Sequence, residues 1–293
     1  MAAPKEHEVR KPAVAGMFYP ADAQQCRSAA QSLVRAEAGA GGGLGGIVPH
    51  AGWICSGAIA GEVIAKLAAS ITPELVVVFG AVHTPIELRL GALASHARWD
   101  LPGGACELAW DLAGLLEKEN DWFATDDRFH LNEHAVEVEM PLVRAAWPAV
   151  RLLPIEVPAI ENAAEIGRRT ARLVLQKGLR AVFLASSDLT HYGPAYRFAP
   201  AGVGMAGLNW AKENDRRLLE RVARFEIDQI VPEARQHLNA CGAGAIAAML
   251  AACVEAGARS ARVLRHASSY ETLAKVAPQP PVDAVGYAGV IVQ

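Results

Sequence analysis

The sequence lacks the features that mark nucleic-acid-binding, membrane and disulfide-stapled proteins. Its 293 residues carry a net charge of −3 and no run of like charge, so a nucleic-acid surface is not expected. No apolar run reaches the ~18 residues that a membrane-spanning helix needs. The cysteine count is odd and no CxxC occurs, which favours reduced thiols in a cytoplasmic protein. The polar opening of the chain does not resemble a signal peptide.

The residues that are abundant indicate an α/β protein. With 52% hydrophobic and 20% charged residues, the chain can build a large core. Apolar runs that predict strands alternate with amphipathic segments that predict helices, which is typical of a central, mostly parallel or mixed sheet flanked by helices. We expect one domain over residues 1–293, with residues 1–8 as a flexible tail. The expected strands are 47–48, 75–79, 88–93, 151–157, 181–185, 261–267 and 285–292, and the expected helices are 21–38, 56–69, 107–118, 136–147, 163–177, 212–225, 227–236 and 243–256.

Three potential metal ligands stand where apolar runs end or a helix begins. His50 follows Ile47-Val48-Pro49, His83 comes just after the strongest predicted strand, and Cys241 precedes a glycine-rich helix start. Open α/β sheets bind ligands at the carboxyl ends of their parallel strands, and consecutive strands tend to be neighbours. Histidine and cysteine converging there would suit a transition metal. Each residue alone also fits a structural role, as a loop histidine or a buried thiol.

Two polar clusters can supply proton-transfer groups. In Ser186-Ser187-Asp188-Leu189-Thr190-His191, Asp188 can orient a ligand or bind metal, and His191 can act as acid or base near neutral pH. An Asx turn is the structural alternative. In the second cluster, Glu133 and His134 can supply outer hydrogen bonds or carry a proton, and Glu137 is expected on the same helix face as His134. A solvated helix cap is the alternative there.

Nucleotide-binding and hydrolase motifs are missing from the sequence. The glycine-rich run at 41–46 precedes a strand, whereas a dinucleotide loop follows one, and neither GxxxxGK[ST] nor GxSxG occurs. Serines near Asp188 and His191 suggest a hydrolase, but the acid and the base are crowded into one turn.

Several short motifs, in order along the chain, resemble the Memo family, whose bacterial and archaeal members are called AmmeMemoRadiSam system protein B. The motifs are RKPAVAGMFYP (10–20), VPHAGWICSG (48–57), FGAVHTP (79–85), NEHAVEVEMP (132–141), SSDLTHYG (186–193), NACG (239–242) and VGYAGV (285–290). They extend over essentially the whole chain.

The resemblance implies a fold like that of the class III extradiol dioxygenases, the LigB-like group. Memo-family proteins are described as binding iron, and also copper, through two histidines and a cysteine, which match His50, His83 and Cys241. His191 matches the acid–base histidine of the dioxygenases, with Asp188 beside it, and His134 matches a further polar position. A thiolate in place of the dioxygenase carboxylate departs from the ring-cleavage pattern. The family name also suggests radical-SAM and AMMECR1-like protein partners.

Three hypotheses follow. The first is an Fe(II)-dependent redox enzyme, with copper or zinc as alternative metals, acting on a small-molecule or peptide substrate with His191, Asp188 and His134 as catalytic residues. The second is a metal- or peptide-binding protein that kept the fold without the chemistry. The third is a metal-independent hydrolase with Ser187 or Cys241 as nucleophile.

Overall fold

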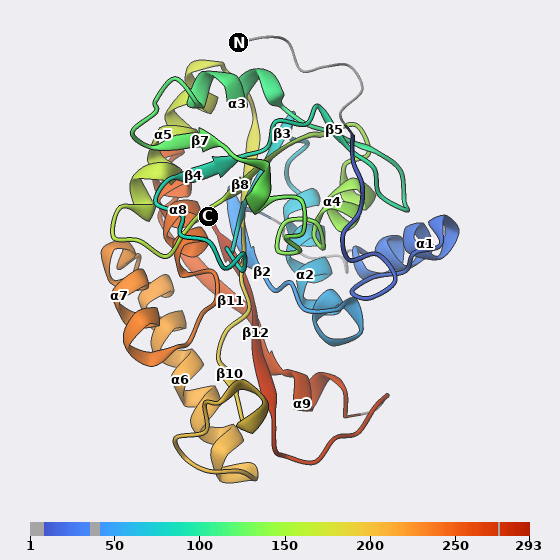
Figure 1. Cartoon of the computed structure of the whole chain (residues 1–293), viewed down its shortest axis with the longest axis vertical. Helices are drawn as coiled ribbons and strands as arrows, with labels where there is room; N and C mark the ends of the chain where they lie inside the picture. The colour runs from blue at the N-terminus through green and yellow to red at the C-terminus, as the bar shows by residue number, and fades with distance from the viewer. Residues whose placement is uncertain (1–8, 36–41, 275) are drawn as a thin grey trace.

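One mixed sheet organises the computed structural model, which describes residues 9–35, 42–274 and 276–293 (Figure 1). Within those residues, its strands lie in the order β10 (His191–Tyr192), β12 (Ala284–Val292), β2 (Gly45–Val48), β9 (Ala181–Ser186), β3 (Leu75–Gly80), β8 (Arg151–Glu156), β4 (Gly91–Leu93) and β7 (Phe123–Thr125), and β11 (Ala261–Ser268) also pairs with β12. A small second sheet contains β1 (Val9–Arg10), β5 (Arg98–Trp99) and β6 (Cys106–Glu107).

The four central strands, β2, β9, β3 and β8, run parallel to one another, whereas β12 and β4 run antiparallel to their central neighbours. Every residue of β3 and β9 is buried. Strands covered on both faces can be apolar at every position, which explains the uninterrupted Leu75–Phe79 run. The predicted fold class, a mixed sheet flanked by helices, is confirmed.

Two hydrophobic clusters cover the two faces of the sheet. Alternate residues of one strand point to opposite faces, so Val76 and Val78 join one cluster while Val77 and Phe79 join the other. The first cluster includes residues of α1 (Ala23–Leu33), α2 (Trp53–Ala68) and α4 (Met140–Ala146). The second includes residues of α3 (Trp110–Leu116), α5 (Ala163–Gln176), α6 (Met205–Ala223), α7 (Ile227–His237) and α8 (Ala243–Glu255). The short helix α9 (Ser269–Thr272) precedes β12.

Helix α8 is buried on all sides from Ala243 to Cys253, and it packs closely against α5. A Cβ atom at Gly167 of α5 would lie only 1.8 Å from the backbone oxygen of Ala248. Small residues therefore let the two helices approach closely, as the composition of this helix predicts.

Several element boundaries differ from the sequence-based expectations. Pro141 inside the predicted 136–147 helix implies a kink or a late start, and α4 does start late, at Met140, with Pro141 in its first turn, where a missing N–H is tolerated. Glu137 therefore lies in a turn, not on a helix face. Helices α2 and α6 begin earlier than predicted, β4 is shorter, and residues 106–107 pair as a strand. The predicted tail at 1–8, the end of the 21–38 helix and part of the 41–46 glycine run lie outside the described residues.

The expected adjacency of the strands that precede His50 and His83 is wrong. Strand β9 lies between β2 and β3 and pairs in parallel with both. The consecutive-strand tendency fails here because a later strand fills the centre of the sheet. As a result, the β9 end, which leads into Asp188, lies between the two histidine-bearing strand ends.

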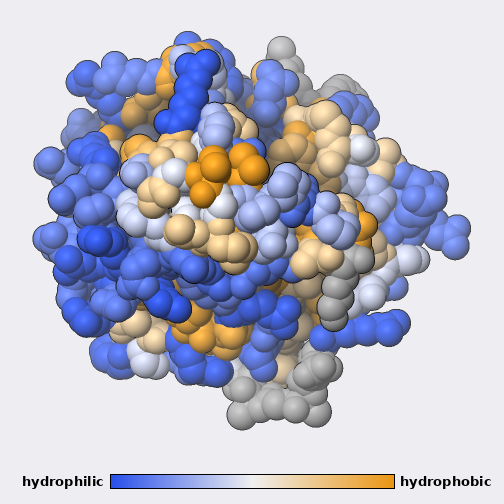
Figure 2. All heavy atoms as spheres, turned by 90° about the horizontal axis from the view of Figure 1, so that it is seen from below, coloured by the Kyte–Doolittle hydropathy of each residue, from blue (hydrophilic) through white to orange (hydrophobic). Residues whose placement is uncertain are grey.

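The lower end of the molecule in Figure 1 carries β10, α9 and the loop that leads into α6. Seen from below, apolar side chains gather there among hydrophilic ones (Figure 2). Val203 and Met205 are exposed large hydrophobic residues of this loop and helix start. None of the described helices is both long and apolar enough to span a bilayer.

Candidate metal centre

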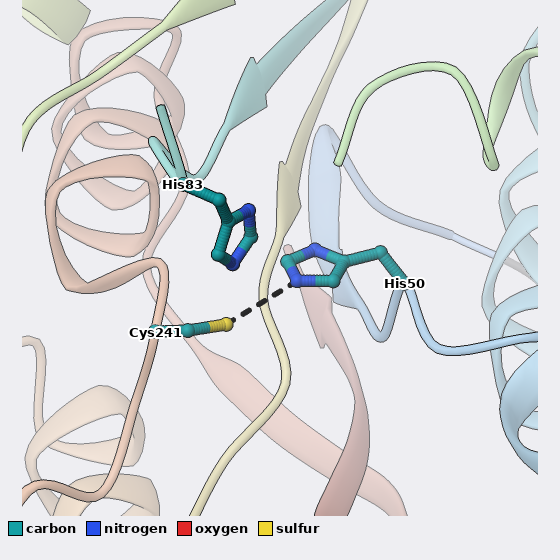
Figure 3. A group of neighbouring side chains, drawn as sticks. All are labelled: His50, His83 and Cys241. Carbon is teal, nitrogen blue, oxygen red and sulfur yellow. Dashed lines mark hydrogen bonds between the residues drawn. The ribbon is translucent and has the colours of Figure 1, made fainter. Parts of the chain in front are cut away.

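His50, His83 and Cys241 converge at the carboxyl end of the parallel strands (Figure 3). One donor atom from each lies within 4.8 Å of the other two. The Nε2 atom of His50 is 3.3 Å from the Sγ atom of Cys241, and the two imidazole rings are perpendicular with centroids 5.2 Å apart. The structure therefore brings together the three residues that the sequence singled out as metal ligands.

The tautomer of His50 is fixed by a buried serine. The Ser186 hydroxyl donates a 2.6 Å hydrogen bond to the backbone oxygen of Ala135, so it must accept from His50 Nδ1, which lies 2.8 Å away. The proton is thus on Nδ1, and the lone pair of Nε2 faces Cys241. Burial, followed by the neighbouring His134 and His83, lowers the pKa of His50 well below its usual value. A neutral imidazole with a free Nε2 is the form that binds metal.

The Glu133 carboxylate contacts the Nδ1 atoms of two other histidines, as Ser186 does for His50. Its carboxylate lies 2.9 Å from His83 Nδ1 and 3.1 Å from His134 Nδ1, and it also accepts from the backbone N–H groups of His83, His134 and Ala135. Although burial opposes it, hydrogen bonds from His134 and His83 hold the pKa of Glu133 far below its usual range. Carboxylates that accept from Nδ1 in this way orient histidine ligands and leave Nε2 free.

The group His83, Glu133 and His134 also has donor atoms within 4.8 Å of one another. Both Glu133 oxygens already accept hydrogen bonds, however, and the imidazoles face this carboxylate through their protonated nitrogens. The cluster therefore reads as support for the first site rather than as a second metal site. The sequence-based expectation that Glu133 supplies outer hydrogen bonds agrees with this placement.

His83 links the carboxylate to the thiol. Burial lowers its pKa, but hydrogen bonds to Cys241 and Glu133 outweigh burial and raise the pKa to about 10. Without a metal, His83 is therefore protonated at neutral pH. A metal ion that binds Nε2 would displace this proton, as metal binding generally does at histidine and cysteine ligands.

Backbone groups hold the thiol of Cys241. The backbone N–H of Asp188 donates to Sγ at 3.3 Å, and the backbone N–H of Cys241 donates to the backbone oxygen of Asp188 at 3.3 Å. Ser187 Oγ lies 3.9 Å from Sγ and accepts from the Gly242 N–H. Cys241 is part-exposed and stands two residues before α8, so its sulfur remains accessible to a ligand.

Asp188 supports the segment that carries His50. Its carboxylate accepts from the His50 N–H at 2.9 Å, and burial raises its pKa to about 7 even though backbone hydrogen bonds from His50 and Ala51 oppose this. It belongs to neither group of converging donor atoms. Of the two roles considered for Asp188, its placement suits orienting the His50 segment better than binding metal.

His191 and His134 flank the three donors. Burial, followed by the charges of His83 and His134, lowers the pKa of His191 to about 4, so its imidazole is neutral at pH 7 and can accept a proton. Its Nε2 is buried and has no hydrogen-bond partner within the described residues. The ring of His134 stacks on that of His83 with centroids 4.5 Å apart, and its centroid lies 4.8 Å from that of the Phe18 ring.

Two sequence-based roles find no support in the geometry. Ser187 Oγ donates to the Asp188 backbone oxygen and has no histidine partner among the described residues, so it is not an activated nucleophile. Glu137 does not face His134. It accepts from Arg10 at 2.5 Å, from the N–H groups of Ala13 and Val14, and from the Tyr19 hydroxyl, and so anchors the segment at 10–19.

Sequence reasoning missed Ser186 as the partner of His50, although it stood inside a selected motif. It also missed Asn214 and Asp215 of α6, which hydrogen-bond to the segments that carry His191 and Cys241. Polar residues inside a helix that is otherwise exposed on one face give no signal of this kind.

Comparison with known proteins agrees with these motifs. The sequence profile of the family described as Memo-like protein matches residues 10–291. This chain belongs to the Memo family. A MEMO1 family protein of Pyrobaculum arsenaticum is 30% identical over 97% of this chain and 98% of its own length. One of Methanosarcina mazei is 33% identical over 98% of this chain and all of its own length. The Memo assignment thus covers the complete set of converging residues.

Proposed function

We propose that this Memo-family chain binds one transition-metal ion through His50 Nε2, His83 Nε2 and Cys241 Sγ. The observation that carries the proposal is the convergence of these atoms within 4.8 Å while Ser186 and Glu133 occupy the other nitrogen of each imidazole. Two imidazoles and a thiolate suit iron, copper and zinc. We propose Fe(II) as the resident metal, with copper and zinc as alternatives.

We further propose that the metal serves a non-haem iron-dependent redox reaction related to that of the class III extradiol dioxygenases. Iron held by His50, His83 and Cys241 would supply Lewis acidity and redox chemistry. The chain contributes His191 as a neutral base whose buried Nε2 has no hydrogen-bond partner within the described part of the chain. His134 is the second proton carrier, and Asp188 keeps His50 in place. The substrate and the radical-SAM and AMMECR1-like partners stay predictions from the family resemblance.

Metal content after anaerobic reconstitution with Fe(II) tests the first proposal. The parent is expected to retain near-stoichiometric iron by mass spectrometry after desalting, whereas His50→Ala and Cys241→Ala lose it. Cys55→Ala is the matched control, because Cys55 is also a half-buried thiol. Equal iron in all four proteins, or none in the parent, would overturn the site.

Turnover tests the second proposal. His191→Ala is expected to keep its iron and to lose dioxygen uptake with a panel of catechols and related small molecules, because only the base is removed. An iron-loaded parent that consumes no dioxygen with any of them would favour a binding protein over an enzyme.

One observation favours that alternative as a second candidate function. A groove of about 490 Å³ is lined by Met17, Phe18, Trp53 and Ile54, among others, and Phe18 also contacts His134. An apolar groove beside the site could hold a peptide side chain. Peptide binding by metal-free and metal-loaded protein, measured by calorimetry, distinguishes this function from catalysis.

A further inference from the structure

Two neighbouring residues in the middle of α6 contact both loops that carry the sulfur side of the site. Asn214 and Asp215 are each about 1% exposed, although they stand in a helix that is largely polar. The first loop, at 187–190, carries Asp188 and leads into His191. The second, at 238–242, carries Cys241. The loops are far apart in the sequence, and α6 lies between them along the chain.

The side-chain amide of Asn214 joins the first loop to the last residue of α7, which leads directly into the second loop. Its Nδ2 donates to the hydroxyl of Thr190 at 3.1 Å and to the backbone oxygen of His237 at 2.8 Å. In return, the Asn239 side chain donates to the backbone oxygen of Asn214 at 2.9 Å. Thr190 adjoins His191, and Asn239 stands two residues before Cys241. One amide group therefore ties Thr190, next to His191, to the end of α7, four residues before Cys241.

Asp215 completes the attachment of the first loop. One carboxylate oxygen accepts from the Thr190 N–H at 2.9 Å, and the other lies 2.8 Å from His266 Nε2 of β11. A Cβ atom at Gly286 of β12 would lie 2.2 Å from this carboxylate, so glycine is required there for the close approach. The buried carboxylate of Asp215 thus joins α6, the first loop and the β11–β12 pair.

General packing does not explain these residues. Asparagine is a poor helix former, and burying an amide is unfavourable unless its hydrogen bonds are made. An apolar side chain in its place would leave the Thr190 hydroxyl and the His237 oxygen without this donor. Asn214 uses both Nδ2 hydrogens, one on Thr190 of the first loop and one on His237 at the end of α7, whereas its buried Oδ1 has no partner within the described residues. These two bonds tie the first loop to the segment that leads into the second.

We infer that Asn214 is a positioning residue that sets Cys241 relative to the Asp188–His191 loop, with Asp215 securing that loop. The inference deepens the proposed metal site and rests on it. Residues that orient metal ligands typically change metal affinity by about 10–100-fold when they are removed.

The test uses Co(II) as a spectroscopic probe in the full chain. Asn214→Ala is expected to bind Co(II) about 10-fold or more weakly than the parent. Its thiolate-to-cobalt charge-transfer and d–d bands should shift, because the sulfur is no longer held in register. The matched control is Thr170→Val in α5, which removes another fully buried hydrogen bond, from Thr170 to the Ile166 oxygen. It should leave the bands and the affinity unchanged.

A second readout in metal-free protein separates this inference from the proposed function. The rate of Cys241 alkylation by iodoacetamide, followed by peptide mass spectrometry, should change several-fold in Asn214→Ala and not in Thr170→Val. A parent without a thiolate–cobalt band would overturn the metal site, and the alkylation rates would then decide the positioning role alone. A normal parent band with unchanged bands and rates in Asn214→Ala would overturn only the positioning role.

Thr190→Val provides a second test in case Asn214→Ala does not fold. It keeps the side-chain shape but removes the hydroxyl that accepts from Asn214. If Asn214→Ala is unfolded by circular dichroism, Thr190→Val is expected to shift the cobalt bands and the alkylation rate in the same direction by a smaller amount. Unchanged values in a folded Thr190→Val protein would then contradict the inference.

Discussion

The nitrogen side and the sulfur side of the site are held in different ways. His50 and His83 are each oriented by one nearby polar side chain, Ser186 and Glu133 respectively. The Cys241 sulfur accepts from one backbone N–H group, that of Asp188, and Asn239, two residues before Cys241, is hydrogen-bonded to α6. Individual side-chain hydrogen bonds thus orient the imidazoles, whereas the position of a loop determines where the sulfur lies. A substitution in one set of supports should therefore act first on its own side, and it can reach the other only where His50 Nε2 meets Cys241 Sγ and through Asp188.

Removing the carboxylate of Glu133 should break the nitrogen side most severely. Glu133→Gln keeps the shape but replaces one acceptor oxygen with an NH₂ group, which cannot accept from the imidazoles or the backbone. We expect metal affinity to fall by about 10–100-fold. Competitive titration with a chelator measures the change. Glu139→Gln is the control, because Glu139 is equally buried but makes no side-chain hydrogen bond within the described residues.

The adjacent serines allow the two sides to be compared directly. Ser186→Ala removes the acceptor for His50 Nδ1, and the loss of one buried hydrogen bond is worth about 1 kcal/mol, or about fivefold in affinity. The His50 tautomer, read from its ring ¹⁵N shifts, should no longer be fixed. Ser187→Ala should leave that tautomer intact and alter the alkylation rate of Cys241 instead, because Ser187 bonds Gly242. The reverse pattern would show that the two sides are not independent.

Replacing Glu139 should change the pH dependence of the free energy of unfolding, while it leaves both sides of the site largely unchanged. Burial, and then the charge of Asp188, raises the pKa of Glu139 well above its usual value of 4.5. The folded state keeps the proton while the unfolded state loses it as pH rises above about 4.5. The contribution of Glu139 to stability therefore falls with rising pH, and Glu139→Gln should remove that fall with little change in metal affinity. Urea unfolding from pH 5 to pH 8 measures it.

The exposed residue Glu87 is the control for this pH dependence. Glu87→Gln should leave the pH profile of the parent unchanged. Parallel profiles for the parent and Glu139→Gln would contradict the burial argument.

The sequence indicated the three converging residues more clearly than the residues that support them. His50 and His83 could be found because each follows a continuous apolar run, and such runs identify strands whose ends meet. The order of the strands could not be read, because β9 joins the centre of the sheet from a distant part of the chain. Asn214 gave no signal, because a polar residue in α6 looks like a solvated helix face until the two loops are placed beside it.

The insertion of β9 between β2 and β3 also has a consequence for biosynthesis. His50 and His83 are made early, but they are not set in place until the intervening strand has been translated, and the third donor, Cys241, follows later still. A nascent chain that exposes only the early histidines lacks one of the three donors of the proposed metal site. In the proposed metal site, all three donors can therefore act together only after the chain has been made as far as Cys241.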